Sequence, residues 1–310
     1  MREGPMVQLG VGLPVSGGWA TPHNMRRIAV RSEELGYQSL WSFQRLLHPV
    51  DQDWGPAYHA VQDPVTALAY VAGFTSRIRL GIAVLNIPFY SPIMMAKPLT
   101  TLDVVSGGRL DVGLGLGWSD QEFQAVGTTS AARGARAEEF VACLDTIWTQ
   151  PEVEHHGTYY DVPLSRVDPK PVQRPRPPLL MGASAEVALR RIGRIADGWI
   201  SSSRTDLTTI GRSIDLVRAA AAEAGRDAAF LRFVVRGVVD LTDHPPADRK
   251  PLQGTPDQIR DDLEQLAAQG VTEVFFDLNW DAATVDAAVD PEAAADAADA
   301  VLTALAPERR

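Results

Sequence analysis

This chain of 310 residues is poor in cysteine, in basic charge and in long hydrophobic runs. Its one cysteine, Cys143, excludes an internal disulfide and a multi-cysteine metal site, and its apolar surroundings predict a small core residue. Asp and Glu outnumber Lys and Arg by 39 to 29, and the net charge of -10 argues against nucleic acid or an anionic membrane as partner. No apolar run approaches the ~20 residues of a membrane span.

The N-terminal residues also lack the basic, apolar and small-residue order of a secretory signal peptide. We therefore expect a soluble, cytoplasmic protein. A hydrophobic content of 45% is enough to bury a sizeable core, and α/β barrels of this length fold as one domain. The sequence thus predicts a single domain over residues 1–310.

Apolar runs typical of strands alternate with helical patterns along most of the chain. Strands are expected at 7–14, 39–43, 78–85, 110–116, 178–183, 197–201, 231–241 and 271–277. Helices are expected at 22–35, 63–76, 93–105, 134–149, 184–195, 207–224 and 255–269, and from 291 onward. Eight strands with helical crossovers predict a (β/α)₈ TIM barrel.

The proline-rich segment 151–178 interrupts this alternation and includes a short hairpin around residues 157–160, so it is predicted to be an insertion in the barrel. A doubly wound open sheet is the alternative fold. Its dinucleotide fingerprint would follow the first strand, but Gly10-Val-Gly-Leu-Pro-Val-Ser lacks the third glycine.

Ligands of such barrels bind at the carboxyl ends of the strands, so candidate site residues are sought there. Those positions hold Gln44, Arg45 and His48 after the second strand, Ala83 and Val84 in the third, Gly117, Trp118 and Glu122 after the fourth, Gly182, Ala183 and Ser184 after the fifth, and Arg204 after the sixth.

The clearest chemistry among them is anion binding after the fifth strand. Gly182-Ala-Ser184 between a strand and a helix offers free backbone N–H groups to a phosphate, although Ser184 is equally suited to be a plain N-cap. Arg204 is either a second contact to that phosphate or a solvated surface residue. Glu122 is either an orienting carboxylate or a first-turn helix residue favoured by the dipole.

Other reaction classes have less support. His48 precedes a proline and is more typical of a loop than of a catalytic base. His155 and His156 do not share one face of their hairpin and have no carboxylate cluster, so no metal is assigned. No Gly-x-Ser-x-Gly elbow is present, which argues against a hydrolase triad.

Three motifs, in chain order, carry a resemblance to a known family. They are Glu34-Leu-Gly-Tyr-Gln-Ser-Leu-Trp41, the glycine-rich run Ser106-Gly-Gly-Arg-Leu-Asp-Val-Gly-Leu-Gly-Leu-Gly-Trp118 with Glu122, and Ala196-Asp-Gly-Trp-Ile200. The chain resembles the bacterial luciferase-like monooxygenase superfamily, specifically its branch of oxidoreductases that use the deazaflavin coenzyme F420.

That resemblance implies a barrel, usually homodimeric, that binds a flavin or deazaflavin at its mouth. It also implies a bulge at Ala83-Val84, often with a non-prolyl cis peptide, that supports the back of the ring. The phosphate would lie at Gly182, Ala183 and Ser184, with Arg204 nearby. Gly113, Gly115 and Gly117 are then interpreted as keeping space open beneath the ring.

Two departures from the family pattern concern the mechanism. Gln44-Arg45 stand where many deazaflavin-dependent members carry Asp-His, and Trp118 stands where others carry a glutamate. Arg45 stays charged at any working pH and is better suited to clamp an anion or an oxygen than to act as a base. His48 is the nearest titratable substitute.

Several functions remain open at this point. The favoured one is hydride transfer between F420 and a small organic substrate; the alternative is an FMN-dependent monooxygenase that uses dioxygen and flavin reduced by a separate reductase. A non-catalytic flavin-binding protein is a third. A sugar-cleaving barrel would need two facing carboxylates, which Asp51, Asp53 and Glu122 do not convincingly supply. Residues 44–62, the segment 151–178 and the loop after the seventh strand are expected to select the substrate.

Overall fold

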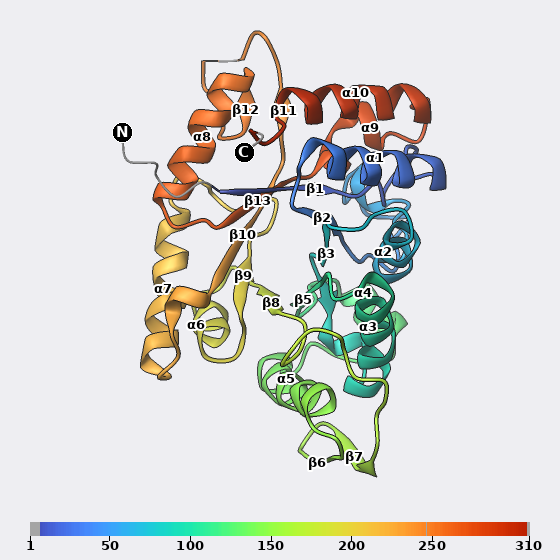
Figure 1. The fold of residues 1–310 in the computed structure, drawn as a ribbon, viewed down its shortest axis with the longest axis vertical. Helices are drawn as coiled ribbons and strands as arrows, with labels where there is room; N and C mark the ends of the chain where they lie inside the picture. The colour runs from blue at the N-terminus through green and yellow to red at the C-terminus, as the bar shows by residue number, and fades with distance from the viewer. Residues whose placement is uncertain (1–6, 246, 309–310) are drawn as a thin grey trace.

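The computed structural model describes residues 7–245 and 247–308. Within them, eight parallel strands form a closed barrel, as predicted (Figure 1). Their bounds are β1 (Gln8–Gly12), β2 (Ser39–Ser42), β3 (Arg79–Ile82), β5 (Leu110–Gly115), β8 (Leu179–Gly182), β9 (Gly198–Ile200), β10 (Arg232–Gly237) and β13 (Glu273–Phe276). The ring closes because β3 pairs with β2 on one side and with β5 on the other, where Leu80 lies opposite Leu110. The short β4 (Leu85–Asn86) continues the third strand beside β5.

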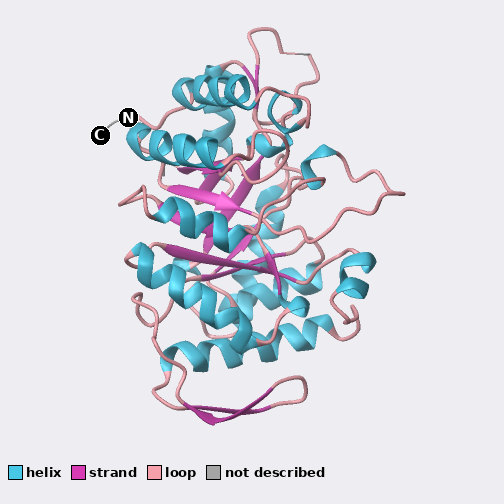
Figure 2. Cartoon of the chain, turned by 90° about the vertical axis from the view of Figure 1, so that its right-hand side faces the viewer, coloured by secondary structure: helices cyan, strands magenta, loops and turns pink. Residues whose placement is uncertain are grey.

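Helices cover the outside of the barrel, as Figure 2 shows for the helices in cyan around the strands in magenta. The crossover helices are α1 (Pro22–Leu35), α2 (Pro64–Ala72), α3 (Pro92–Ser106), α5 (Arg133–Thr149), α6 (Glu186–Ile195), α7 (Ile210–Glu223), α8 (Pro256–Ala268) and α10 (Pro291–Ala304). Their ends follow local sequence signals: Thr21 caps α1 before Pro22, and Gly36 ends it at φ 91°. None of the helices described is long and apolar enough to cross a membrane.

The predicted insertion contains an antiparallel hairpin that lies at the side of the barrel beyond α5, at the bottom of both views (Figures 1 and 2). It consists of β6 (Val153–His156) and β7 (Asp161–Ser165). Glu139 of α5 fixes its turn, because its carboxylate accepts hydrogen bonds from the backbone N–H groups of Thr158, Tyr159 and Tyr160 at 2.8–3.2 Å. The hairpin is thereby tied to the barrel wall.

One predicted strand, at 231–241, is divided in the structure. Strand β10 ends at Gly237, and Asp240–Leu241 forms a separate pair (β11) with Gln253–Gly254 (β12). A side chain at Gly237 would lie 2.7 Å from Leu252 and 3.1 Å from Val274, so the close packing at the end of β10 leaves room only for glycine. Apolar residues continue past Gly237, so the sequence pattern did not show that the strand ends there.

The barrel interior has an apolar layer near its centre. Trp41, Leu180, Ile200, Val234 and Phe275 form a cluster inside the barrel, apart from the larger core between strands and helices. The rings of Trp41 and Phe275 are stacked, with centroids 5.3 Å apart and planes 20° apart. This layer forms the floor of the barrel mouth.

A charged layer lies below it, at the amino ends of the strands. Asp111, fully buried, lies 2.6 Å from Arg79 and 2.7 Å from Arg232, and Arg232 also contacts Glu273 at 2.8 Å. Glu273 in turn accepts hydrogen bonds from Ser39 and from the indole N–H of Trp41. Burial alone would raise the pKa of Asp111, but the two arginines outweigh it and hold that pKa below its usual value.

Candidate active site at the carboxyl ends of the strands

The third strand is interrupted at the barrel mouth between Ile82 and Leu85. The peptide bond between Ala83 and Val84 is cis, which confirms the bulge expected from the family resemblance. Val84 is partly buried and packs against the interior apolar cluster. It is therefore placed to present a small apolar surface to whatever lies in the mouth.

Glycines of the neighbouring strands make this placement of Val84 feasible. A side chain at Gly115 would lie 2.4 Å from Val84, and one at Gly113 would lie 1.9 Å from the carbonyl oxygen of Ile82. The interpretation that these glycines keep space open beneath a ring is thus wrong, because Val84 and the backbone of β3 fill that space. Gly117 differs from them: it turns the chain at φ 71° after β5.

Gln44 supports the bulge from the side. Its side-chain oxygen accepts a hydrogen bond from the backbone N–H of Asn86 at 3.0 Å, and its amide donates to the hydroxyl of Tyr90 at 2.5 Å. Burial raises the pKa of Tyr90, and the hydrogen bond from Gln44 opposes that shift. The structure thus gives Gln44 contacts that position the bulge.

Arg236 approaches the same bulge from the opposite wall. Its guanidinium donates to the carbonyl oxygen of Ala83 and lies over the rings of Phe43 and Trp280 at 5.2 and 4.7 Å. Its Nε lies 3.4 Å from Asp277, whose pKa is raised by burial against the opposing effect of Arg236. The sequence analysis did not identify Arg236 or Asp277; their only signal was a charge at the end of an apolar strand.

Arg45 and Glu122 form a buried ion pair across the mouth. Their closest atoms are 2.6 Å apart, and the side chains are 6% and 1% exposed. Glu122 also accepts a hydrogen bond from the backbone N–H of Leu46 at 2.7 Å. The first-turn interpretation of Glu122 is confirmed, because Glu122 lies in the first turn of α4 (Asp120–Ala125), capped by Ser119; its role as an orienting carboxylate stays a prediction.

Three aromatic rings surround Arg45. Its guanidinium carbon lies 4.6 Å from the centre of Trp118, 4.8 Å from Tyr58 and 5.3 Å from Trp54. Burial lowers the pKa of Arg45, and Glu122 opposes that shift. An anionic ligand would therefore compete with Glu122 for Arg45, which weighs against the anion clamp expected from the sequence.

His48 lies in the loop beyond Arg45, packed among aromatic rings. Its ring centre is 4.1 Å from that of His59 and 5.4 Å from that of Trp54, and its Nε2 accepts from the backbone N–H of Trp54 at 3.4 Å. It belongs to the lining of neither cavity described below. These contacts are those of a packed loop residue.

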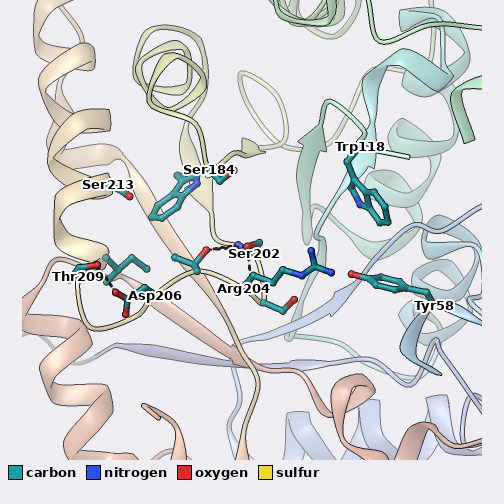
Figure 3. A pocket seen from close by; sticks show the side chains of 12 residues that line it. Tyr58, Trp118, Ser184, Ser202, Arg204, Asp206, Thr209 and Ser213 are labelled. Atoms are coloured by element: carbon teal, nitrogen blue, oxygen red, sulfur yellow. Dashed lines mark hydrogen bonds between the residues drawn. The ribbon is translucent and has the colours of Figure 1, made fainter. Parts of the chain in front are cut away.

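A cavity of about 510 Å³ opens among the loops that follow the strands β5, β8 and β9; Ala83 and Val84 of the bulge are not in its lining. Its lining is rich in hydroxyl groups, with one arginine, one aspartate and three aromatic rings: Tyr58, Trp118, Ser184, Trp199, Ser202, Ser203, Arg204, Thr205, Asp206, Thr209, Ile210 and Ser213. Figure 3 shows Arg204 extending across this cavity toward Tyr58. The structure thus brings together Trp118, Ser184 and Arg204, which the sequence predicted from three separate strand ends.

The structure does not support the alternative that Ser184, after the fifth barrel strand, is a plain N-cap. Helix α6 begins at Glu186 with Ala185 as its cap residue, so Ser184 does not cap the helix; it lines the cavity instead. Gly182 lies beside Val84, where a side chain would come within 3.4 Å of it, and Ala183 accepts a hydrogen bond from Trp199 at 2.9 Å. These residues connect the bulge to the hydroxyl-lined cavity.

A second cavity, of about 340 Å³, shares Tyr58 and lies among the loops after β1 and β2. Its lining consists of Gly17, Arg45, Leu46, Leu47, Tyr58, His59, Ala60, Val61 and Gln62. Across residues 7–245 and 247–308, no group of three or more His, Cys, Asp or Glu side chains is arranged to hold a metal ion.

Comparison with known proteins identifies relatives over most of the chain. Residues 6–250 match the family model of luciferase-like monooxygenases. An uncharacterized protein of Mycobacterium tuberculosis is 35% identical over 220 residues, 71% of this chain and 70% of its own. The FMNH₂-dependent dimethylsulfone monooxygenase of Pseudomonas putida is 31% identical over 210 residues, 67% of this chain and 55% of that enzyme.

Solved structures share the fold over nearly the full length. The monooxygenase RslO1 from Streptomyces bottropensis superposes with a TM-score of 0.80 at 22% identity, covering 96% of this chain and 98% of that one. The coenzyme F420-dependent tetrahydromethanopterin reductase from Methanopyrus kandleri gives 0.74 at 18% identity, covering 95% and 97%.

Proposed function

Because the chain belongs to the luciferase-like monooxygenase family, we propose that it binds FMN in the hydroxyl-lined cavity and oxygenates a small organic substrate with dioxygen. Flavin- and deazaflavin-dependent enzymes both occur among the proteins it resembles. The sequence motifs favoured F420 and left FMN as the alternative; the cavity leads us to propose FMN instead. The observation that carries it is the charge of the cavity lining.

That lining suits a single phosphate. Hydroxyls of Ser184, Ser202 and Thr205 and the guanidinium of Arg204 supply donors, and Asp206 is the one acidic residue in the lining. FMN ends in one phosphate group. F420 carries a phosphodiester and a tail of glutamate carboxylates, which would favour a lining with several cations. One arginine beside one aspartate matches the smaller negative charge.

The cradle for a ring also fits. Val84 is partly buried on the apolar interior cluster and occupies the space that the absent side chains of Gly115 and Gly182 leave for it. Trp118 and Tyr58 line the same cavity and would shield the ring from water. When bound, reduced FMN supplies the electrons that activate dioxygen; the chain holds the phosphate, supports the ring and positions the substrate.

The residues after the second strand support this choice. Neither Gln44 nor Arg45, which replace the acid–base pair of many deazaflavin enzymes, donates or accepts a proton readily at neutral pH. Hydride transfer to or from a carbonyl or alcohol requires such a group close to the reacting oxygen. Oxygenation by reduced FMN does not require an acid–base group at these two positions to the same degree.

Hydride transfer with F420 is the second candidate. The observation in its favour is Arg133, an exposed residue whose guanidinium donates to the carbonyl oxygen of Gly117 at 2.9 Å, at the rim of the mouth. There it could meet a carboxylate of a longer cofactor tail. A titration of the purified protein with both cofactors separates the two candidates.

The test measures binding of FMN, riboflavin and F420 to the wild-type chain and to two variants. We expect FMN to bind more tightly than riboflavin, which lacks the phosphate. Arg204→Ala should weaken FMN by about 10- to 100-fold and leave riboflavin unchanged, as expected for one charged hydrogen bond. Arg212→Ala is the matched control, because Arg212 is an exposed neighbour outside the lining. Tight F420 binding without FMN binding would establish the second candidate instead.

We also propose that the protein is a homodimer and that a separate reductase supplies reduced FMN. The dimer proposal rests on the exposed faces of α2 and α3, two helices packed against each other. Tyr70 of α2, Phe74 in the turn after it, and Met94 and Val105 of α3 are 38%, 40%, 67% and 60% exposed. Val105→Lys should shift the mass measured by light scattering toward the monomer, whereas Val187→Lys on α6, which is 67% exposed, should not.

A further inference from the structure

The turn that follows β9 carries both charged side chains in the lining of the hydroxyl-lined cavity, Arg204 and Asp206. We propose that Asp206 is a specificity-determining residue that limits the negative charge of the ligand, so that the cavity accepts one phosphate and disfavours a ligand with further anionic groups. This inference rests on the proposed function, which places the phosphate of FMN in this cavity. It goes beyond that function because it assigns the choice of cofactor to one side chain.

The carboxylate of Asp206 is fixed by the turn itself. Its Oδ1 accepts hydrogen bonds from the backbone N–H of Thr208 at 2.9 Å and from the hydroxyl of Thr208 at 2.7 Å. Its Oδ2 accepts from the hydroxyl of Thr209 at 2.9 Å. These hydrogen bonds, the one from the Thr208 hydroxyl most, lower the pKa of Asp206 below its ordinary 3.8. The carboxylate is therefore ionised at neutral pH and contributes a fixed negative charge to the cavity.

Arg204 is held apart from Asp206, although a single residue separates them in the chain. The backbone N–H of Arg204 donates to the hydroxyl of Ser202 at 3.2 Å. Figure 3 shows the side chain of Asp206 beside Thr209. The guanidinium of Arg204 points away from it, toward Tyr58. Within residues 7–245 and 247–308, neither side chain has an ion-pair partner, so both charges remain available to act on a ligand.

The two charges act on an anion in opposite directions. Arg204 attracts the first anionic group and can hold it by a charge-assisted hydrogen bond. Asp206 repels every negative charge in the cavity, by roughly 2- to 3-fold in affinity per unit charge at separations of about 6–8 Å in water. A single phosphate in contact with Arg204 is still bound. Each further anionic group meets the repulsion of Asp206 without a second cation among the described lining residues to offset it.

Two substitutions separate the charge of Asp206 from its place in the turn. Asp206→Asn removes the charge and keeps an oxygen that can accept from the backbone N–H of Thr208. Asp206→Glu keeps the charge on a longer side chain. Asp215→Asn is the matched control, because Asp215 is an exposed residue of α7 outside the lining and its substitution changes the net charge by the same amount. Thermal melts report whether each variant folds.

The affinities of five probes are then compared between the wild type and the variants. Riboflavin, FMN and F420 are followed by fluorescence, and inorganic phosphate and pyrophosphate by phosphorus NMR. We expect Asp206→Asn to leave riboflavin unchanged, to tighten FMN by roughly 3- to 10-fold and to tighten F420 by more, since the gain grows with the charge of the ligand. Pyrophosphate should gain more than phosphate. Asp206→Glu and Asp215→Asn should stay close to the wild type with all five probes.

Ionic strength distinguishes an effect of charge from a change of shape. Raising the salt concentration from about 0.01 M to about 1 M shortens the screening length from about 30 Å to about 3 Å. The higher affinity of Asp206→Asn for the anionic probes should therefore disappear at the higher concentration. A gain that persists there, an equal gain for riboflavin, or the same gain in Asp215→Asn would overturn the inference.

The outcomes also separate this inference from the proposed function. FMN binding of equal affinity in the wild type and in Asp206→Asn overturns the inference alone. Weak pyrophosphate binding that Asp206→Asn strengthens, in a chain that binds no flavin, overturns the proposed function and leaves Asp206 as the residue that limits the charge of the ligand.

Discussion

The ion pair between Arg45 and Glu122 should contribute more to the stability of the mouth than any surface pair. Glu122→Gln removes the negative charge but keeps an oxygen that can accept from the backbone N–H of Leu46. It leaves Arg45 buried without its counter-charge. Removing one partner of a buried pair costs about 3–5 kcal/mol, against about 0–1 kcal/mol for an exposed pair.

Thermal unfolding of two matched variants measures this difference. Glu186→Gln is the control, because Glu186 also pairs with an arginine, at 2.9 Å, but with side chains 40% and 63% exposed. We expect Glu122→Gln to lower Tm by several degrees and Glu186→Gln to leave it nearly unchanged, since ~1 kcal/mol shifts Tm by roughly 2–4 °C even in chains of 150–250 residues.

A double variant distinguishes an unpaired charge from lost packing. Arg45→Met with Glu122→Leu removes both charges and keeps apolar volume, so it should recover much of the stability lost in the single variant. Hydrogen exchange across residues 45–62 reports whether the loss is local to this loop or global. A Glu122→Gln variant as stable as Glu186→Gln, with unchanged exchange in the loop, would refute the reasoning.

Two further predictions concern the barrel. Asp111→Asn should cost about 3–5 kcal/mol in the free energy of unfolding, because it leaves Arg79 and Arg232 without their shared counter-charge. The folded state lowers the pKa of Asp111 below its ordinary 3.8. The ionised carboxylate therefore stabilises the fold fully above pH 3.8, and this stabilisation is lost as the pH falls through the lowered pKa. An acid titration followed by circular dichroism should show this loss of stability in the wild type and not in Asp111→Asn. Gly113→Ala should cost at least about 1–3 kcal/mol in urea unfolding, because its new methyl group would lie 1.9 Å from the backbone of Ile82. Gly73→Ala, with its nearest neighbour at 3.7 Å, should be neutral or slightly stabilising.

The barrel could be predicted from the sequence because its signals are local. Each strand is a short apolar run, and helix ends carry proline, glycine or a capping side chain, as Thr21, Gly36 and Thr255 illustrate. The break at Gly237 was missed because the apolar pattern runs across it. The residues that pack closely around Gly237, Leu252 and Val274, are distant in the sequence and leave no local signal there.

The site was predictable only in part, for the same physical reason. Strand ends placed Trp118, Ser184 and Arg204 correctly in one cavity, because parallel strands end on one side of a barrel. The partners of the charges could not be predicted, since Glu122 lies 77 residues from Arg45 and Arg236 is 153 residues from Ala83. A sequence pattern shows that a charge is present but not which distant group balances it.

The position of the charged layer has a consequence for how this protein can change. Its ionic contacts join strands at the end of the barrel remote from the mouth, whereas the loops around the two cavities hold one another through side chains such as Gln44 and Glu122. The two ends of the barrel are therefore held by separate sets of contacts. Substitutions in residues 46–62 would leave the ionic contacts between the strands intact, so this loop is where we would first introduce variation in directed evolution of the proposed activity, keeping Arg45 and Glu122 because their ion pair stabilises the mouth.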